Sequence, residues 1–430
     1  MKRRMTEKLN IWKSQTTERL PLLIYGARQV GKTHIVLEFG HKQFANVIYV
    51  NFEQDPGLIP YFEGDIAPKR IINVLEKYYQ KPIHAEDTLI FFDEIQVCER
   101  ALTSLKYFAE SGPEYYVIAA GSLLGVAVNR SKFSFPVGKV QMETLYPLDF
   151  EEFLWARGQA LLADEIKRCC DLSLAINDHL HKEALTAYKE YLIVGGMPAA
   201  VKASIAIVPS LTEVEVRRAI LNAYIADMAK YATSAESVKI KSAFESIPTQ
   251  LAKENSKFQY KLIKSGGRAA LYGDSIDWLV ASCVVLKCIK CDHGFMPLMA
   301  YQDLSSFKLY MSDIGLLSAQ SGITLQSLAD NSLNQFSGAL TENYVAQALT
   351  AKGFTLHYWN SKNTAEVDFL IVWNGSVIPV EVKAAENNRS RSLTVYTERY
   401  KPQMAIRISS RNFGFENGIK SIPLYAIFAL

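Results

Sequence analysis

The stretch GARQVGKT, residues 26–33, constrains the fold more strongly than any other part of the chain. It fits the pattern G-x-x-x-x-G-K-[ST], it follows the apolar run LLIY, and the helix-forming run HIVLEF comes directly after it. Strand, glycine-rich loop and helix in this order form the P-loop unit, whose backbone N–H groups wrap a phosphate. The competing interpretation is a chance match in an ordinary strand–turn–helix, and the flanking runs on both sides disfavour it.

Each residue type in this loop has a physical reason. Gly26 and Gly31 let the backbone bend around a phosphate, Lys32 reaches the β- and γ-phosphates, and Thr33 offers an oxygen to Mg²⁺. The positive end of the following helix adds to the attraction. The predicted nucleotide-binding segment consists of Gly26, Ala27, Arg28, Gln29, Val30, Gly31, Lys32, Thr33 and His34.

A second apolar run, TLIFFDEIQ at residues 88–96, ends in two carboxylates. Asp93 is expected to hold Mg²⁺ through water, and Glu94 to polarise the attacking water, so Glu94 joins Lys32 as a predicted catalytic residue. The carboxyl ends of parallel strands form the ligand side of an open α/β sheet, which favours this interpretation over two solvated acids at a strand end.

Together these signals resemble the AAA-type ATPases, in particular a prokaryotic branch with DEIQ after the second motif and a segment like SFPVGKVQMETLYPLDFEEFL. The resemblance implies ATP and Mg²⁺ as cofactors. It also implies a third catalytic residue, Ser122 at the end of YYVIAAGS, as a γ-phosphate sensor; capping of the next turn is an equal alternative. Relatives carry Gly-Arg where this chain has Gly138 and Lys139, and lysine lacks the planar fork of an arginine finger. Arg130 is a nearby substitute that the spacing does not prove.

Bulk composition sets wide limits. A chain of 430 residues, 49% hydrophobic and 21% charged, is expected to form two to four globular domains. Its net charge of +3 neither requires nor excludes a nucleic-acid partner. No apolar run is long enough to span a bilayer and no secretory signal is present, so we expect a cytoplasmic protein without a membrane partner. The six cysteines are scattered and are predicted to be reduced thiols.

The middle of the chain changes character twice. From about residue 151 to 232 the apolar period is helical, and the region resembles the helical lid of an AAA-type module. From 233 to 325, SAFESIPTQLAKEN, FQYKLIKSG and RAALYGDSIDWLVASCVV predict three helices, and VLKCIKC with FKLYMSD predicts a hairpin. These are the parts of a winged helix, a module that often binds DNA, so DNA is left open as a partner.

The stretch VDFLIVWNGSVIPVEVKA places charges inside an apolar, β-branched hairpin. A helix with Glu342, a strand that begins with Asp368, a tight turn and a strand with Glu381 and Lys383 resemble the PD-(D/E)xK nuclease fold. The resemblance implies that Glu342, Asp368 and Glu381 hold a second Mg²⁺ or Mn²⁺ and that Lys383 helps to activate water. The alternative is a purely structural ion-pair network.

As a whole, the chain resembles prokaryotic AAA_14-like ATPases with a carboxy-terminal DUF4143 domain. We predict an α/β protein with a P-loop core at 1–150, a helical lid at 151–232, a winged-helix-like module at 233–325 and a PD-(D/E)xK-like domain at 326–430. Three functions follow: an ATPase coupled to a DNA-related activity, a nucleotide-gated protein-binding switch with an inactive nuclease-like fold, or an ATP-regulated metal-dependent nuclease. AAA-type relatives often form rings, so a homo-oligomer is left open.

Overall fold

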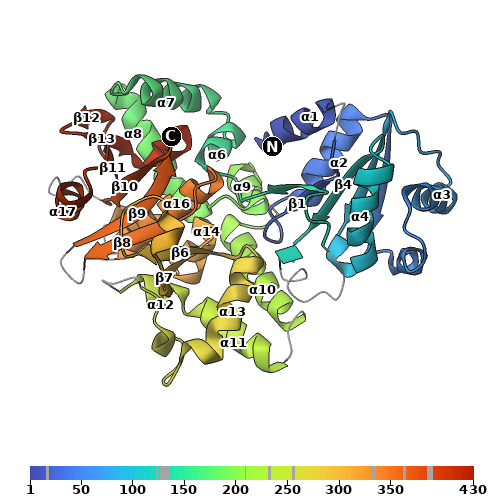
Figure 1. The fold of residues 1–430 in the computed structure, drawn as a ribbon. Coiled ribbons are helices and arrows are strands. Elements are labelled where there is room, and N and C mark those ends of the chain that lie inside the picture. Colours follow the sequence, from blue (N-terminus) through green and yellow to red (C-terminus); the bar gives the residue numbers. More distant parts are fainter. Residues whose placement is uncertain are drawn as a thin grey trace. The chain divides into compact units, whose positions relative to one another are not determined.

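The structure is a computed structural model that describes residues 1–15, 19–122, 124–125, 135–208, 210–230, 234–253, 257–330, 336–361, 365–384 and 391–430. The chain divides into two compact units (Figure 1). The amino-terminal unit comprises Lys2–Tyr146 with Ala281–Cys283, and the carboxy-terminal unit comprises Pro147–Val280 with Val284–Leu430. This division is coarser than the four predicted domains, whose finer boundaries remain predictions. Within the described ranges, no helix has the length and apolar character needed to cross a membrane.

The amino-terminal unit is built on a five-stranded sheet in the order β2-β3-β4-β1-β5. All neighbouring strands run parallel. The strands are β1 (Leu22–Tyr25), β2 (Asn46–Asn51), β3 (Thr88–Asp93), β4 (Tyr116–Gly121) and β5 (Gln141–Thr144). Every residue of β3 is buried, as expected for a continuous apolar run in a parallel sheet that is covered on both faces. The predicted parallel P-loop sheet is confirmed.

Helices cover both faces of this sheet (Figure 1). They are α1 (Met5–Ser14), α2 (Lys32–Gln43), α3 (Pro68–Tyr79) and α4 (Glu99–Ser111), with the 3₁₀ turns η1 (Pro56–Phe62) and η2 (Ile95–Val97). Apolar residues of α3 and α4 share one core with Ile90 and Phe92 of β3. On the opposite face, Gly40 of α2 lies against Leu89 and Val47. Successive side chains of β3 therefore point to opposite faces of the sheet, where they pack against two separate layers of helices.

The carboxy-terminal unit begins with helices, as the apolar period predicts. They are α6 (Phe150–Ala156), α7 (Ala160–Leu172), α8 (Asp178–Val194), α9 (Pro198–Ile205) and α10 (Glu213–Lys230). A Gly-Gly turn joins α8 to α9, and there Gly196 accepts a hydrogen bond from the Leu148 N–H (2.7 Å) and donates one to Asp313 (2.6 Å). The turn is therefore a structural joint within this unit.

The next region contains α11 (Ser234–Glu245), α12 (Ile247–Leu251), α13 (Ala269–Ala281), α14 (Ile314–Gln320) and α15 (Leu325–Ala329). The short helix predicted at FQYKLIKSG is wrong, because only the 3₁₀ turn η3 (Tyr260–Leu262) forms there. Two hydrogen bonds tie the start of this segment to its neighbours: the Phe258 N–H donates to Phe307 (2.7 Å), and the Gln259 N–H donates to the Gln250 side chain (2.9 Å).

One mixed sheet of eight strands completes the carboxy-terminal unit, in the order β12-β13-β11-β10-β9-β8-β6-β7. Its strands are β6 (Val285–Cys291), β7 (Gln302–Met311), β8 (His357–Ser361), β9 (Ala365–Trp373), β10 (Ser376–Val382), β11 (Ala405–Ser409), β12 (Gly414–Glu416) and β13 (Ile419–Pro423). The predicted hairpin of β6 and β7 forms, but β6 also pairs in parallel with β8. The sheet thus runs across the boundary expected at 325/326, and these strands do not form a separate wing.

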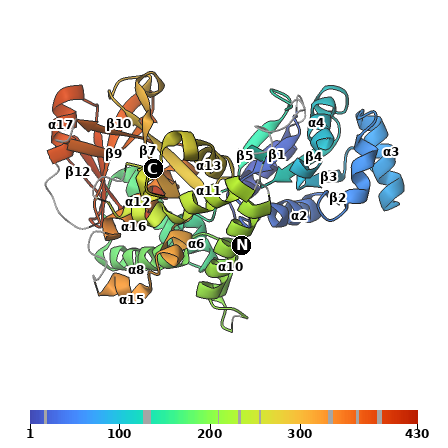
Figure 2. The same ribbon diagram turned by 90° about the horizontal axis from the view of Figure 1, so that it is seen from below.

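The last part of the chain has the predicted order of elements. Helix α16 (Phe336–Ala351) precedes β8, β9 and β10, and α17 (Arg391–Tyr400) lies beside β9 and β10 (Figure 2). The β9–β10 turn has φ 48° at Asn374 and φ 75° at Gly375, as a type I′ hairpin requires. The hairpin prediction is confirmed, with Val380 opposite Phe369.

Candidate functional site

The P-loop connects β1 to α2, and its backbone conformation explains its glycines. Gly31 has φ 95°, in the left-handed region that glycine adopts without steric cost. A Cβ at Gly26 would lie 2.2 Å from the carbonyl oxygen of Leu145, so no other residue fits there without a shift of the backbone. Gln29 also has a left-handed backbone, with φ 65°, and its side chain is exposed. The loop is thus bent into a tight curve ahead of the helix.

The other predicted loop residues contribute in different ways. The side chains of Ala27 and Val30 are buried in the core. Arg28 forms an ion pair with Glu53 (3.4 Å) at the edge of the loop. The side chain of His34 is 77% exposed on α2. Any role of Ala27, Val30 and His34 in nucleotide binding therefore rests on their backbone N–H groups.

Lys32 is the buried cation of this loop. Its Nζ donates to the carbonyl oxygens of Gly26 and Ala27, both at 2.9 Å. Within the described ranges it forms no ion pair with a carboxylate. Burial lowers the pKa of Lys32 to about 8, and the charges of Glu94 and Asp93 offset only part of this effect. The ammonium group is thus buried without full charge compensation, a state that an anion would relieve.

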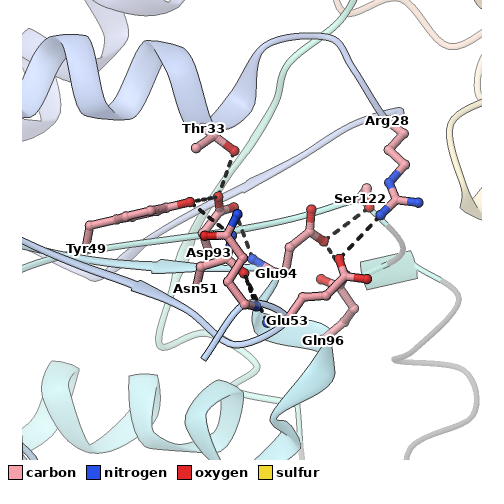
Figure 3. Close-up of polar contacts among 10 residues, drawn as sticks. Arg28, Thr33, Tyr49, Asn51, Glu53, Asp93, Glu94, Gln96 and Ser122 are labelled. Atoms are coloured by element: carbon pink, nitrogen blue, oxygen red, sulfur yellow. Dashed lines mark hydrogen bonds and ion pairs between the residues drawn. The ribbon is translucent and has the colours of Figure 1, made fainter. Parts of the chain in front are cut away.

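Asp93 gathers polar groups at the carboxyl end of β3. Its Oδ2 accepts hydrogen bonds from the hydroxyls of Thr33 (2.7 Å) and Tyr49 (3.1 Å), and its Oδ1 accepts the N–H of Glu94 (3.0 Å) (Figure 3). Burial raises the pKa of Asp93, while the Thr33 hydrogen bond acts in the opposite direction. A hydroxyl and a carboxylate that meet at one point are the hard oxygen donors that Mg²⁺ prefers, so Thr33 and Asp93 fit the predicted ion.

Glu94 follows Asp93 with a left-handed backbone, at φ 49°. Its Oε2 accepts a hydrogen bond from Nε2 of Gln96 (2.6 Å) and a longer one from the hydroxyl of Ser122 (3.4 Å) (Figure 3). Two of the predicted catalytic residues, Glu94 and Ser122, are therefore in contact. Because β1, β3 and β4 are adjacent and parallel, their carboxyl ends bring Lys32, Asp93 and Ser122 to the same edge of the sheet.

Two residues near this site were not predicted from the sequence. Gln96 binds Glu94, and its place two residues after the acid was the available signal. Arg3 is buried and donates to the carbonyl oxygens of Val30 (3.1 Å) and Tyr146 (2.6 Å). These hydrogen bonds connect the P-loop to the residues that follow β5. No local pattern relates Arg3 to a loop 27 residues away.

Lys139, at the position considered for an arginine finger, belongs to an ion pair on the surface. Lys139 forms an ion pair with Glu110 (3.2 Å), and both side chains are well exposed. The substitute, Arg130, lies outside the described residues. Lys139 is therefore engaged in a surface ion pair, and Arg130 stays a prediction.

The predicted site in the carboxy-terminal unit has an unexpected centre. Lys308 of β7 is fully buried, and its Nζ pairs with Glu342 of α16 (2.8 Å) and Glu366 of β9 (2.6 Å). It also lies 5.0 Å from the centre of the Tyr358 ring, and the Tyr310 hydroxyl donates to the same Glu342 oxygen. Burial alone would lower the pKa of Lys308, but the neighbouring carboxylates outweigh it and hold that pKa well above its usual value.

The other predicted members lie nearby with partners of their own. Asp368 accepts the N–H of Val382 (2.7 Å), so its side chain closes the end of the β9–β10 ladder. Burial, and then the charge of Glu342, raise the pKa of Asp368 to about 7. Glu381 is buried and pairs with the half-exposed Lys383 (3.2 Å).

The second metal ion does not fit this arrangement. In the part of the chain that the structure describes, no three His, Cys, Asp or Glu side chains come together as a metal-binding group. The Glu342 oxygen expected at a metal is already bound by Lys308 and Tyr310. Glu342 and Asp368 therefore lie near the internal ammonium group of Lys308, which supplies the positive charge that a metal would bring, and Glu381 pairs with Lys383.

Comparisons with known proteins agree with the arrangement of the chain. Residues 18–154 match the family "AAA domain" (AAA_14), residues 185–327 match a domain of unknown function (DUF8612), and residues 337–427 match another (DUF4143). No curated protein matches the chain.

Several solved structures are similar to the chain. The Walker-type ATPase PABY2304 of Pyrococcus abyssi has a TM-score of 0.44 and 13% identity, over 74% of this chain and 94% of that chain. The ORC2 protein of Aeropyrum pernix has a TM-score of 0.37 and 14% identity, over 76% of this chain and 94% of that chain. Together with the P-loop and the parallel sheet, these matches make the chain similar to the AAA domain over residues 18–154 and to DUF4143 over residues 337–427.

Proposed function

We propose that this protein binds ATP and hydrolyses it with Mg²⁺ at the P-loop. The observation that carries the proposal is Lys32, a buried cation that among the described residues donates to two loop carbonyls, beside Thr33 and Asp93, which share one hydrogen bond. A triphosphate supplies the negative charge that Lys32 lacks, and the Thr33 and Asp93 oxygens suit the accompanying ion.

The chain's own residues then have distinct tasks. Lys32 exchanges the carbonyls of Gly26 and Ala27 for phosphate oxygens, and the N–H groups at the start of α2 surround the same phosphates. Thr33 and Asp93 would hold Mg²⁺, which, when bound, neutralises charge on the phosphates. Glu94 takes a proton from the attacking water as general base.

The test is ATP hydrolysis by the full chain with Lys32→Ala. We expect loss of both nucleotide binding and hydrolysis. Lys42→Ala is the matched control, because Lys42 lies on the same helix but is exposed, and it pairs with Glu38 (2.6 Å) on the surface of that helix. Equal activity of the Lys32→Ala variant and the wild type would contradict the proposal.

For the carboxy-terminal unit we favour the nucleotide-gated binding switch, with a nuclease-like fold that does not cleave. The supporting observation is Lys308, whose ammonium group already neutralises Glu342 and Glu366. The order of α16, β8, β9, β10, α17 and β11 is compatible with the PD-(D/E)xK resemblance, yet a fold does not imply the activity.

A nuclease assay with Mg²⁺ or Mn²⁺ tests this choice. We expect no cleavage by the wild type with or without ATP. Metal-dependent cleavage that disappears in both Asp368→Ala and Lys383→Ala would instead establish the ATP-regulated nuclease.

The predicted DNA-related activity is a separate question about the partner. ATP hydrolysis measured with and without duplex DNA decides it. Stimulation by DNA would favour a nucleic-acid partner, whereas an unchanged rate would favour a protein partner for the switch.

A further inference from the structure

The turn after β3 holds a side chain for which the proposed chemistry has no role so far. Gln96 lies in the 3₁₀ turn η2, directly after Glu94 and Ile95, and its amide points back to the Glu94 carboxylate (Figure 3). At 2.6 Å, this is the shorter of the two hydrogen bonds to Oε2 of Glu94. Hydrogen bonds to a charged acceptor are short and about twice as strong as neutral ones.

The backbone creates this contact. A left-handed residue at Glu94 reverses the chain immediately after the strand, which lets a side chain two residues later reach the acid. Non-glycine residues seldom adopt this conformation. The hydrogen bond between Gln96 and Glu94 therefore depends on this unusual backbone conformation.

The sheet also leaves space for the amide. Gly121 ends β4, and a Cβ at that position would lie 2.3 Å from Oε1 of Gln96. The amide thus occupies the volume that a side chain at residue 121 would fill. Oε1 is buried and has no hydrogen-bond partner in the described structure.

This packing leaves the amide one orientation. A carboxylate accepts hydrogen bonds only, so the NH₂ group of Gln96 has to face Glu94 and the oxygen has to face Gly121. Leaving this buried acceptor unpaired costs free energy. A purely structural glutamine would be expected to satisfy both ends.

We propose that Gln96 is the positioning residue of the general base: it fixes the Glu94 carboxylate through Oε2 and leaves Oε1 for the attacking water. This inference rests on the proposed ATPase activity. Within the described ranges no hydrogen bond reaches Oε1 of Glu94. The amide is uncharged, so it orients the carboxylate without adding a second charge at the base.

The chain offers a matched control for this role. Gln141 on β5 donates from Nε2 to Glu143 (3.4 Å), again across two residues and in the same unit. Its partner is engaged by Lys8 (2.6 Å) and belongs to no predicted site. Gln141→Leu therefore makes the same chemical change without touching Glu94.

The experiment compares Gln96→Leu with Gln141→Leu in the full chain, measuring the single-turnover rate of ATP hydrolysis and, separately, the Kd for ATP. We expect Gln96→Leu to lower the rate about 10- to 100-fold, a fraction of what a positioned base contributes, and to change the Kd by less than about twofold. Gln141→Leu should match the wild type. Equal rates for the two variants would overturn the role of Gln96.

A second variant keeps the test decisive if Gln96→Leu fails to fold. Gln96→Asn keeps an amide but shortens the side chain by one methylene, which draws the amide back from Glu94. We expect the rate of ATP hydrolysis to fall as in Gln96→Leu, with an unchanged Kd for ATP. A wild-type rate in Gln96→Asn would also overturn the inference.

Failure of the inference is distinguishable from failure of the proposed function. If the wild type binds ATP without hydrolysing it, the ATPase proposal itself is wrong. If the wild type hydrolyses ATP and both Gln96 variants behave as the wild type does, only the role of Gln96 is wrong.

Discussion

Lys32 and Lys308 are both buried lysines beside acidic residues, but their surroundings differ in one decisive way. Lys32 donates to two carbonyl oxygens, and burial lowers its pKa to about 8. Lys308 pairs with Glu342 and Glu366 at 2.8 and 2.6 Å, and the carboxylates hold its pKa well above the usual value despite complete burial. The first cation is prepared for an external anion, whereas the second already has internal ones.

The contrast teaches how to separate a binding site from a structural network when both contain the expected residue types. A buried charge without a paired opposite charge costs free energy, and a ligand can recover that cost. A metal ion would recover no such free energy in the cluster around Lys308, because the carboxylates there are already neutralised and the ion would first have to displace Lys308. The charge balance of the site, more than its list of carboxylates, indicates function.

The largest expected effect comes from making one substitution at both lysines. Lys308→Met leaves the partly buried carboxylates of Glu342 and Glu366 uncompensated and should lower the free energy of unfolding by about 3 kcal/mol. Lys32→Met removes a cation without an ion-pair partner and should change it by less than about 1 kcal/mol. The measurement is urea unfolding followed by hydrogen exchange. Exchange of the β7 amides reports the stability of the carboxy-terminal unit, and exchange of the β3 amides reports that of the amino-terminal unit. Equal losses at both positions would remove the distinction.

The next effect concerns the raised pKa of Asp368, which is about 7 and reflects burial and the charge of Glu342. A folded-state pKa above the ordinary value means that the stability contributed by this group is present below about pH 4 and is lost as the pH rises through 7. Asp368→Asn keeps an oxygen for the Val382 N–H. It should therefore stabilise the protein by on the order of 2 kcal/mol at pH 8 and little at pH 4.

The pH dependence of Asp368→Asn is measured by unfolding at both pH values. Asp274→Asn on the exposed side of α13 is the control and should show no such dependence. A stabilisation of Asp368→Asn that is the same at both pH values would show that the carboxyl group does not titrate as expected.

A smaller effect should appear in ATP binding at alkaline pH. The pKa of Lys32 is about 8 in the free protein, and phosphate charges would raise it, so binding above pH 8 takes up a proton. The Kd for ATP should then rise by up to about tenfold per pH unit above pH 8 and stay nearly flat between pH 6.5 and 7.5. Calorimetry in two buffers of different ionisation enthalpy counts the protons. Binding at pH 9 without proton uptake would contradict a lowered pKa.

The smallest effect compares two tyrosines that donate to carboxylates. Tyr310→Phe removes the hydrogen bond from a fully buried tyrosine to Glu342 and should cost about 1–2 kcal/mol. Tyr49→Phe removes a longer, half-buried bond to Asp93 (3.1 Å) and should cost about 0.5 kcal/mol. Thermal unfolding of both variants gives the two values. A larger loss of stability in Tyr49→Phe than in Tyr310→Phe would show that the hydrogen bond to Asp93 is the stronger of the two.

The geometry of the candidate nucleotide site was largely predictable because its residues are local in the sequence. Lys32 and Thr33 are adjacent, Asp93 ends an apolar run, and a parallel sheet brings such strand ends together. The contribution of Gln96 was not predictable, since it depends on the left-handed backbone of Glu94 and on Gly121 from a different strand.

The carboxy-terminal cluster was predicted only in part. The hairpin with Asp368 and Glu381 follows from alternation and the Asn-Gly turn, and both are present. Lys308 and Glu342 are 34 residues apart, and the lysine sits in the apolar run FKLYMSD, where the pattern indicates only a strand. Because a buried lysine needs a counter-charge, the position of Lys308 inside an apolar run was the available signal for a nearby carboxylate.

The pairing of β6 with β8 has a consequence for how the protein is made. During synthesis the hairpin of β6 and β7 emerges first, and β8 follows about 65 residues after β6, a delay of roughly 3–13 s at ordinary translation rates. Until α16 and β9 arrive, Lys308 has neither carboxylate partner and keeps that face of the hairpin hydrated. The same lysine that neutralises the finished core would thus protect the nascent chain from premature collapse and aggregation.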